Sequence, residues 1–556
     1  MEKLWLKSYP EGVPAEIDLS RYQSILELFS TACENYAESK AYSNLGSSLT
    51  YKELEEKSRY FAAFLQQELG LKKGDRVAIM LPNLLQFPVA MFGAMRAGCI
   101  LVNINPLYTH HELTHVLNDC GAKVLVILAN FKDVLAKTLP EVELKHVILT
   151  EIADLFPAPK RVLLNFVIRH IKKMVPKTKI KGAYRFNQAL HQGKKSALTP
   201  VTLTQEDVAF LQYTGGTTGV AKGAILTHRN LIANILQLEA WFKPAVGDNN
   251  LDNVVVITPL PLYHIFSLTV NCLFFLLRKS LIVLITNPRD IPNFVKTLKK
   301  QPFNIITGVN TLYNALANNP DFAKLDFSHL KLTVAGGMAV QKAVAKRWQD
   351  ITGCVLIEGY GLTETSPVVT ANLLDNKEFS GSIGLPIPST EVSIRDQDHN
   401  ELEIGEVGEI CVRGPQVMRG YWQSGEVTER AFSVDGWLHT GDMGRIDNHG
   451  FFYVVDRIKD MINVSGFNVY PNEIEDIIAK YPGVLEVAVV GIADEHSGEV
   501  PKAFIVKKDP NLTEKDILKY CHENMTGYKV PKQVEFRDEL PKTNVGKILR
   551  RALRTN

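Results

Sequence analysis

The sequence feature that most constrains the fold is the stretch LQYTGGTTGVAKGA at residues 211–224. Apolar residues typical of a buried strand lead directly into glycines and threonines, and a lysine follows them. Glycines let backbone N–H groups approach a phosphate closely, threonine hydroxyls are short donors, and lysine supplies positive charge. The stretch therefore predicts a polyphosphate-binding loop at the end of a strand, formed by Tyr213, Thr214, Gly215, Gly216, Thr217, Thr218, Gly219 and Lys222.

Two other interpretations of this loop fit less well. The Walker motif GxxxxGK[ST] cannot be aligned with it, because no lysine here follows the required glycine with Ser or Thr after it. A flexible surface turn explains a lone glycine pair better than it explains this dense set of glycines. We therefore expect a phosphate-binding loop that differs from the Walker type.

The pattern before and after the loop predicts an α/β fold. Thr50-Tyr51-Lys52-Glu53 is a capping box that begins a helix ending near residue 68. Apolar strands at 77–81, 101–103 and 124–128 alternate with helices at about 87–96 and 112–118, and further strands follow at 254–257, 304–307, 331–335 and 355–357. Such alternation predicts doubly wound parallel sheets covered on both faces. With 556 residues, the chain is expected to form two or more domains.

A second motif, EGYGLTET, follows the strand at 355–357. Tyr360 can stack on adenine, Thr363 can donate to an α-phosphate, and Glu364 is a hard oxygen ligand suited to Mg²⁺. Gly337, after the strand at 331–335, lets the backbone approach a flat ring. Each residue alone also fits a turn, a cap or a surface acid, so the prediction depends on the whole string.

A third motif, GWLHTGD, presents Asp442 on a turn. Its carboxylate has two acceptor oxygens, which suits the vicinal hydroxyls of a ribose, although an Asp that only stabilises the turn is the alternative. The charged segment 456–460 follows the strand at 451–455 and has the composition of a linker between domains.

Composition excludes several classes of protein. The seven cysteines are scattered and form no CxxC, so neither a disulfide framework nor a zinc site is expected. We therefore expect the protein in a reducing, cytoplasmic compartment. A net charge of +2 gives no general attraction to nucleic acid. The first residues have no apolar core of signal-peptide length. Polar residues interrupt the apolar region 265–286, so we expect it in the interior rather than across a membrane.

The segment from about 155 to 205 has eleven Lys and Arg residues and no Asp or Glu. Within it, Arg161, Asn165, Arg169 and Lys172 fall on one helical stripe, and apolar residues fill the rest. Such a helix suits an anionic membrane surface, which we expect residues 160–185 to contact. The alternative is a core helix with a solvated edge.

The ordered motifs resemble the phosphate-binding and adenine-binding signatures of the adenylate-forming superfamily of acyl-CoA synthetases and luciferases. The resemblance extends from the first helix to the tail. It implies a large N-terminal domain, residues 1–455, of doubly wound sheets and a distorted barrel that contains the basic insertion. A hinge at 456–462 and a mobile α+β domain at 463–556 follow. Members are often dimeric, so a homodimer is possible.

The resemblance also assigns roles to residues of this sequence. His264 lies beside the acyl carboxylate, the apolar run 265–277 forms one wall of an acyl tunnel, and Lys547 is the adenylation lysine. Taken alone, these three features also fit a structural histidine, core packing and a solvated basic tail. Arg457 contacts ribose or phosphate, Lys459 is the hinge, Gly466 lies near the CoA channel, and Thr214 and Glu364 hold Mg²⁺.

Phrases such as PLYHIF, TGVNTL and VSGFNVYPNEIED are most similar to the bacterial long-chain fatty acid–CoA ligases. The resemblance implies ATP-dependent conversion of long-chain fatty acids to acyl-CoA through an acyl-adenylate, at the inner face of the cytoplasmic membrane. Some long-chain synthetases have a gating Trp shortly after the His, where this chain has Leu268. The alternatives are a fatty acyl-AMP ligase that serves a carrier protein, a ligase for medium-chain or other carboxylates, and a non-catalytic lipid-binding protein.

Overall fold

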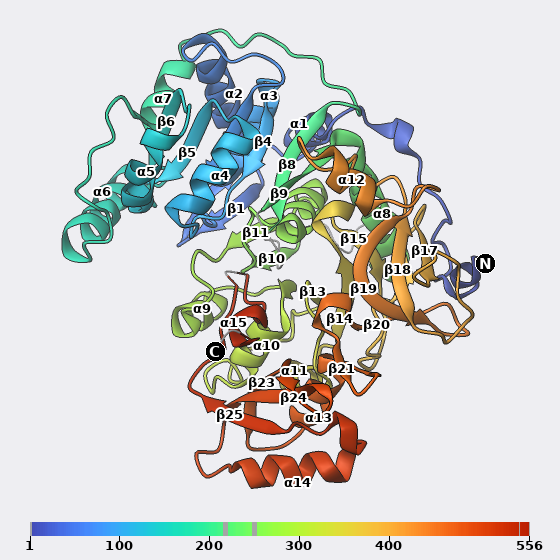
Figure 1. The fold of residues 1–556 in the computed structure, drawn as a ribbon. Helices are drawn as coiled ribbons and strands as arrows, with labels where there is room; N and C mark the ends of the chain where they lie inside the picture. The colour runs from blue at the N-terminus through green and yellow to red at the C-terminus, as the bar shows by residue number, and fades with distance from the viewer. Residues whose placement is uncertain (1–2, 215–220, 247–252, 544, 555–556) are drawn as a thin grey trace.

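The computed structural model describes residues 3–214, 221–246, 253–543 and 545–554 (Figure 1). Four sheets of seven, nine, four and five strands make up the fold. The first three belong to a large N-terminal part, and the last forms a separate unit at the C-terminal end of the chain. This arrangement is the α/β fold that the alternation of strands and helices predicts.

The seven-stranded sheet contains the first predicted strands in the order β7-β6-β5-β3-β4-β8-β9. All neighbours in it are parallel except β8 and β9, which form an antiparallel pair at the edge. The strands are β3 (Arg76–Met80), β4 (Ile100–Asn103), β5 (Val124–Leu128), β6 (His146–Thr150), β7 (Tyr184–Arg185), β8 (Val208–Thr214) and β9 (Lys222–Thr227).

Helices cover both faces of this sheet. On one face α2 (Tyr51–Gln67) packs against α3 (Gln86–Arg96) and α7 (Phe186–Gly193). On the other face α4 (His110–Cys120) contributes Leu113, Val116 and Leu117 to a core shared with the strands. The predicted capping box is confirmed, because the Thr50 side chain accepts from Glu53 N–H and Glu53 accepts from Thr50 N–H.

The nine-stranded sheet has the order β16-β15-β14-β13-β12-β10-β11-β1-β2. Its six middle strands, from β14 to β1, are parallel, and α9 (Ile291–Leu298), α10 (Asn310–Ala317) and α11 (Lys342–Thr352) pack on one face. The strands are β1 (Lys40–Asn44), β2 (Ser47–Thr50), β10 (Val255–Thr258), β11 (Leu281–Leu284), β12 (Ile305–Gly308), β13 (Leu332–Gly336), β14 (Leu356–Gly361), β15 (Val368–Ala371) and β16 (Leu385–Pro386).

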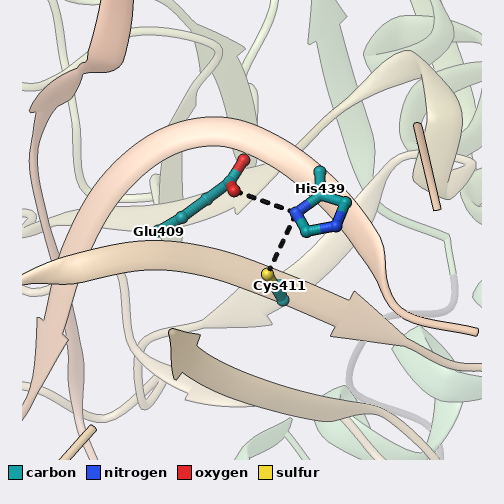
Figure 2. A group of neighbouring side chains, drawn as sticks. All are labelled: Glu409, Cys411 and His439. Carbon is teal, nitrogen blue, oxygen red and sulfur yellow. Dashed lines mark hydrogen bonds and ion pairs between the residues drawn. The ribbon is translucent and has the colours of Figure 1, made fainter. Parts of the chain in front are cut away.

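The third sheet is antiparallel and four-stranded, and it belongs to the large N-terminal part, for which the resemblance predicts a distorted barrel. A single bridge joins its strand β20 to Gly384, just before β16, through Phe452, and a second bridge joins Ala224 of β9 to Tyr421 in the segment after β18. One face of its central pair presents Glu409, Cys411 and His439 side by side (Figure 2). Its strands are β17 (Glu391–Arg395), β18 (Gly408–Arg413), β19 (Leu438–Ile446) and β20 (Phe452–Arg457).

The C-terminal unit has a hydrophobic core of its own, whose buried members all lie between Ile462 and Val530. Strand β25 pairs in parallel with β24, and α13 and α14 pack together. Its elements are β21 (Ile462–Val464), β22 (Phe467–Val469), α13 (Pro471–Ile478), β23 (Val484–Asp494), β24 (Gly498–Lys507), α14 (Glu514–Asn524), β25 (Gln533–Arg537) and α15 (Arg551–Arg554).

The basic segment contains the predicted helix, as α6 (Ala158–Phe166) continued by the π-helical η5 (Val167–Ile171), at the periphery of the molecule (Figure 1). Part of its predicted polar stripe contacts the protein: Asn165 accepts from Ala153 N–H and donates to Asp154, and Arg169 pairs with Glu151, whereas Lys172 is exposed. Several large apolar side chains here are exposed as well: Val162, Leu163, Phe166, Ile171 and Met174, each more than half exposed. The alternative of a core helix with a solvated edge is therefore wrong.

None of the helices in the described ranges is both long enough and apolar enough to cross a bilayer.

The packing of α7 on α2 generates a stability prediction. A Cβ atom on Gly193 would lie 1.8 Å from the backbone oxygen of Tyr60, so Gly193→Ala forces the two helices apart. We expect a loss of about 1–3 kcal/mol in the free energy of unfolding, seen as a lower thermal midpoint. Gly425→Ala is the matched control, because nothing lies within 4 Å of its Cβ position. Equal midpoints for the two variants would contradict this packing.

Candidate functional site

A cavity of about 1880 Å³ lies between the large sheets and the C-terminal unit. Its lining includes Thr214 at the end of β8, Gly336 at the end of β13 and Tyr360 near the end of β14. Ligands bind at the carboxyl ends of strands in open α/β sheets, so the location is the expected one. Ordinary ligand pockets measure about 300–1,000 Å³. This cavity therefore has room for more than one substrate at a time.

The predicted phosphate loop lies partly outside the described residues: Gly215, Gly216, Thr217, Thr218 and Gly219 all do. Two predicted residues of the loop that are described, Thr214 before residues 215–220 and Lys222 after them, lie close to one another.

Those two residues are register partners at the open end of the β8–β9 pair. Thr214 lines the cavity, whereas Lys222 is exposed, with its Nζ 5.8 Å from the centre of the Tyr421 ring. The ring of Tyr213 packs against the backbone at Gly223, and its hydroxyl donates to Asp119. The Tyr213 side chain thus braces the strand pair against α4.

Residues from three motifs meet at the Asp442 carboxylate. The Tyr360 hydroxyl donates to Asp442 Oδ2 at 2.8 Å, and Arg457 Nε lies 3.2 Å from Oδ1. Asp442 and Arg457 are also register partners on β19 and β20. Burial, followed by the Asp442 charge, holds the pKa of Tyr360 well above its usual value. Sequence reasoning predicted these residues separately, and the structure brings them together on one wall of the cavity.

Glu364 and Thr363 follow β14 in the short helix η8 (Thr363–Thr365), and both line the cavity. Glu364 Oε1 accepts a hydrogen bond from the Tyr421 hydroxyl at 2.7 Å. Sequence reasoning missed Tyr421, because its contact depends on the bridge between Tyr421 and Ala224, which no local pattern indicates.

Glu358 is a second residue that sequence reasoning left without a role. Its side chain accepts from Val340 N–H at 3.0 Å, and the residue is buried in the cavity wall beside Gly359 and Tyr360. Burial raises the pKa of this carboxyl to about 8, so it is mostly protonated at neutral pH. The only available signal was its position as the first residue of the EGYGLTET motif.

His264 lies in the wall of the cavity as a neutral imidazole. Burial, reinforced by the nearby Lys547 charge, lowers its pKa to about 3. Its Nδ1 faces Phe266 N–H at 3.4 Å and acts as the acceptor there, so the ring proton belongs on Nε2. The imidazole can therefore donate one hydrogen bond at neutral pH but adds no charge.

Fewer residues of the apolar run 265–277 line the cavity than predicted. Only Ile265, Phe266 and Val270 of the run 265–277 line it, with Leu238 and Phe242 of α8 (His228–Val246) also contributing. The rest of the run, largely in the π-helix η6 (Ser267–Phe274), packs in the main core, and Leu268 is among those buried residues. The prediction that the whole run forms a tunnel wall is therefore wrong.

Lys547 extends from the C-terminal unit into the cavity. A Cβ atom on Gly337 would lie 3.1 Å from Lys547 Cε and 3.4 Å from Nζ, so the missing side chain at Gly337 makes room for this lysine. Burial lowers the Lys547 pKa to about 8; Arg457 lowers it further, whereas Asp442 and Glu364 oppose the shift. The ammonium therefore lies within the electrostatic reach of the residues that the other motifs supply.

Contacts between the two parts of the chain hold Lys547 in this position. Thr311 on α10 donates to Gly546 O at 2.8 Å, and Arg289 donates to Thr543 O at 3.2 Å. Farther away, Asn314 donates to Leu485 O at 2.8 Å. The structure thus shows the C-terminal unit docked on α10, with Lys547 inside the cavity.

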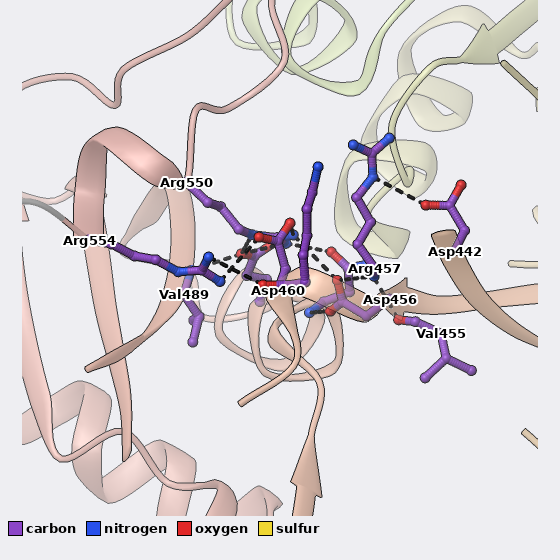
Figure 3. A network of polar contacts seen from close by, with 11 residues as sticks. Asp442, Val455, Asp456, Arg457, Asp460, Val489, Arg550 and Arg554 are labelled. Atoms are coloured by element: carbon purple, nitrogen blue, oxygen red, sulfur yellow. Dashed lines mark hydrogen bonds and ion pairs between the residues drawn. The ribbon is translucent and has the colours of Figure 1, made fainter. Parts of the chain in front are cut away.

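A buried ion network lies at the predicted hinge (Figure 3). The Arg550 guanidinium contacts Glu475 at 2.9 Å, Asp456 at 3.4 Å and Asp460 at 3.5 Å. These carboxylates together hold the pKa of Arg550 above its usual value, and burial raises the pKa values of Asp456 and Glu475. Sequence reasoning missed Arg550, because a second arginine follows it and nothing local distinguishes the two.

The two remaining predicted residues are placed differently from one another. Lys459 lines the cavity in the short helix η9 (Ile458–Asp460), and its burial lowers its pKa. Gly466 lies at the exposed turn between β21 and β22 with φ +87° and is not part of the cavity lining.

Comparison with known proteins gives matches along nearly the whole chain. Residues 29–422 match the AMP-binding enzyme family, and residues 473–547 match the AMP-binding enzyme C-terminal domain. The long-chain-fatty-acid–CoA ligase of Escherichia coli O157:H7 is 56% identical, over 100% of this chain and 98% of that protein. Its namesake in Haemophilus influenzae is 51% identical over the same shares. ATP-bound MatB from Rhodopseudomonas palustris is 28% identical, with a TM-score of 0.82 over 95% of this chain and 98% of that one.

The network at Arg550 generates a prediction with a pH dependence. Arg550→Met leaves buried carboxylates without their counter-charge, so we expect a loss of about 3–5 kcal/mol at pH 7. The pKa values of Asp456 and Glu475, already raised by burial, then rise further. The folded variant binds more protons than the unfolded chain, so its deficit shrinks as the pH falls from 7 toward 5.

Denaturant unfolding of the full chain at several pH values measures this effect. Arg554→Met is the control, since the polar partners of Arg554 among the described residues are Asp460 and the Lys459 carbonyl, and its side chain is one-third exposed. We expect a clearly smaller loss for it. A deficit for Arg550→Met that is constant between pH 5 and 7 would argue against the buried network.

Proposed function

The chain belongs to the AMP-binding enzyme family, and from that premise we propose that it converts long-chain fatty acids to acyl-CoA, with ATP and CoA as co-substrates. Identity to curated long-chain-fatty-acid–CoA ligases over the full length supports the reaction. The observation that supports it most in the structure is the placement of Lys547, from the C-terminal unit, in a cavity lined by Glu364, Asp442 and His264.

The chemistry has two steps, because hydroxide is a poor leaving group from a carboxylate. First, a carboxylate oxygen attacks the α-phosphorus of ATP; the new O–P bond forms, the bond to the β-phosphate oxygen breaks, and pyrophosphate leaves. Second, the CoA sulfur attacks the acyl carbon, the thiol proton is lost, and AMP leaves. Neither step needs a nucleophile from the protein.

The first step brings two anions together, and the cationic residues at the cavity offset their repulsion. Lys547 would contact the carboxylate and α-phosphate oxygens, and Lys222 would contact the outer phosphates. The neutral His264 would donate its Nε2–H to a carboxylate oxygen, which orients the acid without adding charge. A lysine suits the task at position 547, because it is a compact, mobile charge on a long stem.

Mg²⁺ is expected with the nucleotide, and the donors present fit it. Glu364 and Thr214 both offer oxygen atoms to the cavity, and only Oε1 of Glu364 is used by Tyr421. Carboxylate and hydroxyl oxygens are the ligands that this hard cation prefers. When bound, Mg²⁺ would neutralise part of the phosphate charge.

The same wall of the cavity would bind the nucleoside. Tyr360 would stack on adenine beside the open backbone of Gly337, and Thr363 would donate to the α-phosphate. Asp442 would accept the ribose hydroxyls, and Arg457, which already pairs with it, would contact ribose or phosphate.

The second step requires a different set of groups at the acyl carbon. We infer that the C-terminal unit turns about Lys459, withdraws Lys547 and brings the turn at Gly466 toward the cavity as part of the CoA channel. The exposure of Gly466 in the docked arrangement is consistent with this movement.

We further propose that α6 and η5 bind an anionic membrane surface at the inner face of the cytoplasmic membrane. Four exposed apolar side chains project from α6 and η5, Met174 adds a fifth just after them, and Lys172, Lys173, Lys177 and Lys179 are exposed beside them. Apolar residues that enter the lipid boundary and lysines that contact anionic headgroups are the two features of a surface-bound helix. Binding to a membrane would bring the enzyme to its lipid substrate.

The pH dependence of the first step tests the role of Lys547. Since burial lowers its pKa to about 8, the lysine loses its charge as the pH rises through and above that value. We expect the single-turnover rate of pyrophosphate release to fall along an alkaline limb in the wild-type enzyme. Lys547→Arg should be slower but show no such limb, because a guanidinium stays protonated. An unchanged limb in this variant would assign the titration to another group.

Vesicle co-sedimentation tests the membrane proposal. Replacing Leu163, Phe166 and Ile171 with Ser should abolish binding to anionic vesicles, and Lys172→Gln with Lys173→Gln should weaken it by about 1 kcal/mol per lysine. The control is Lys324→Gln, because Lys324 is an exposed lysine outside α6 and η5, in the segment after α10. Binding that is unaffected by the three apolar replacements would refute the proposal.

A further inference from the structure

Outside the cavity, one group of side chains has a composition that the proposed reaction does not use. Glu409 and Cys411 lie on β18, and His439 lies opposite Cys411 on the paired strand β19 (Figure 2). The pairing register of β18 and β19 shifts between Glu409 and Cys411, and the two side chains lie on the same face beside His439 (Figure 2). Cross-strand pairing thus brings a carboxylate, a thiol and an imidazole to one point.

The distances show that the thiol and the carboxylate both contact the same ring nitrogen of His439. Cys411 Sγ is 3.6 Å from His439 Nδ1, and Glu409 Oε2 is 2.9 Å from the same atom. A Cys–His–Glu relay would need the thiol and the carboxylate on different ring nitrogens, as in a catalytic triad. These contacts therefore do not form a nucleophile with its base.

The ligand atoms of Glu409, Cys411 and His439 all lie within 4.8 Å of one another, which is close enough for one metal ion to contact all three. In tetrahedral coordination, bond lengths of about 2.3 Å for Zn–S and about 2.0–2.1 Å for Zn–N place the two ligand atoms about 3.5 Å apart. The observed separation of sulfur and nitrogen is 3.6 Å. In the described part of the chain, no other set of three His, Cys, Asp or Glu side chains has its ligand atoms all within 4.8 Å of one another.

We propose that Glu409, Cys411 and His439 bind a divalent cation of the zinc class, which takes the place of the proton between His439 and Glu409. Thiolate, imidazole and carboxylate are the ligands such ions prefer. The His399 ring lies 4.8 Å from the His439 ring and is exposed, so it or water can complete the coordination.

Cysteine binds a metal ion as the thiolate, so metal binding at this site is expected to release protons.

The site lies next to the nucleotide-binding wall. The second oxygen of Glu409 accepts from Gly441 N–H at 2.8 Å, and Gly441 directly precedes Asp442. An ion here would hold the same carboxylate that positions the turn before Asp442. This position is distinct from the Mg²⁺ position proposed at Glu364 and Thr214, and the inference does not depend on the proposed reaction.

Cobalt binding to the metal-free full-length enzyme, in the absence of ATP, tests the proposal. We expect one Co²⁺ per chain with tetrahedral visible absorption and a thiolate charge-transfer band, displaced by Zn²⁺ with release of protons. Cys411→Ser should lose the charge-transfer band, and His439→Gln should lose high-affinity binding. Cys354→Ser, a half-buried cysteine whose sulfur neighbours Thr333, is the matched control and should bind as the wild type does.

Thermal unfolding of each variant identifies any that fail to fold, and the wild-type spectrum decides the question without them. Absence of stoichiometric Co²⁺ binding to the wild type would overturn the proposal. So would a charge-transfer band that persists in folded Cys411→Ser or disappears in Cys354→Ser.

Discussion

The arrangement of the whole molecule depends on placing one lysine charge in a cavity that two parts of the chain enclose. Burial alone disfavours the Lys547 ammonium, and Asp442 and Glu364 offset that cost in part. The docked position is held by hydrogen bonds from Thr311 and Arg289 to the segment that contains the lysine. The incoming phosphates would complete the compensation, so substrate binding and domain docking favour each other.

At the predicted hinge the clustered buried charges are negative, and a positively charged side chain neutralises them. Asp456, Asp460 and Glu475 are brought together where the C-terminal unit begins, and Arg550 from the tail neutralises them. Because Arg550 is only three residues after Lys547, the network also fixes the base of the segment that extends into the cavity. The position of Lys547 is thus linked to the hinge about which it is proposed to move.

The sequence allowed the α/β architecture and many of the residues that line the cavity to be predicted, because both depend on local patterns. The capping box at Thr50 and the strands β8, β13 and β14 are present where the local pattern predicts them, although β14 continues through Tyr360 to Gly361 and does not end before the motif. Contacts between distant strands and segments were not predictable: Tyr421 with Glu364, Arg550 with Glu475, and His439 with Cys411. The apolar run after His264 was over-assigned, because core packing and a tunnel wall have the same composition.

The central claim is that Lys547 acts in adenylation and then leaves the acyl carbon to CoA. Separate assays of the two half-reactions in Lys547→Ala test it most directly. The account predicts that acyl-adenylate formation from fatty acid and ATP falls by at least about 10²-fold. It also predicts that thioester formation from supplied acyl-adenylate and CoA stays close to the wild-type rate. Equal loss in both half-reactions, or an undiminished first half-reaction, would contradict it.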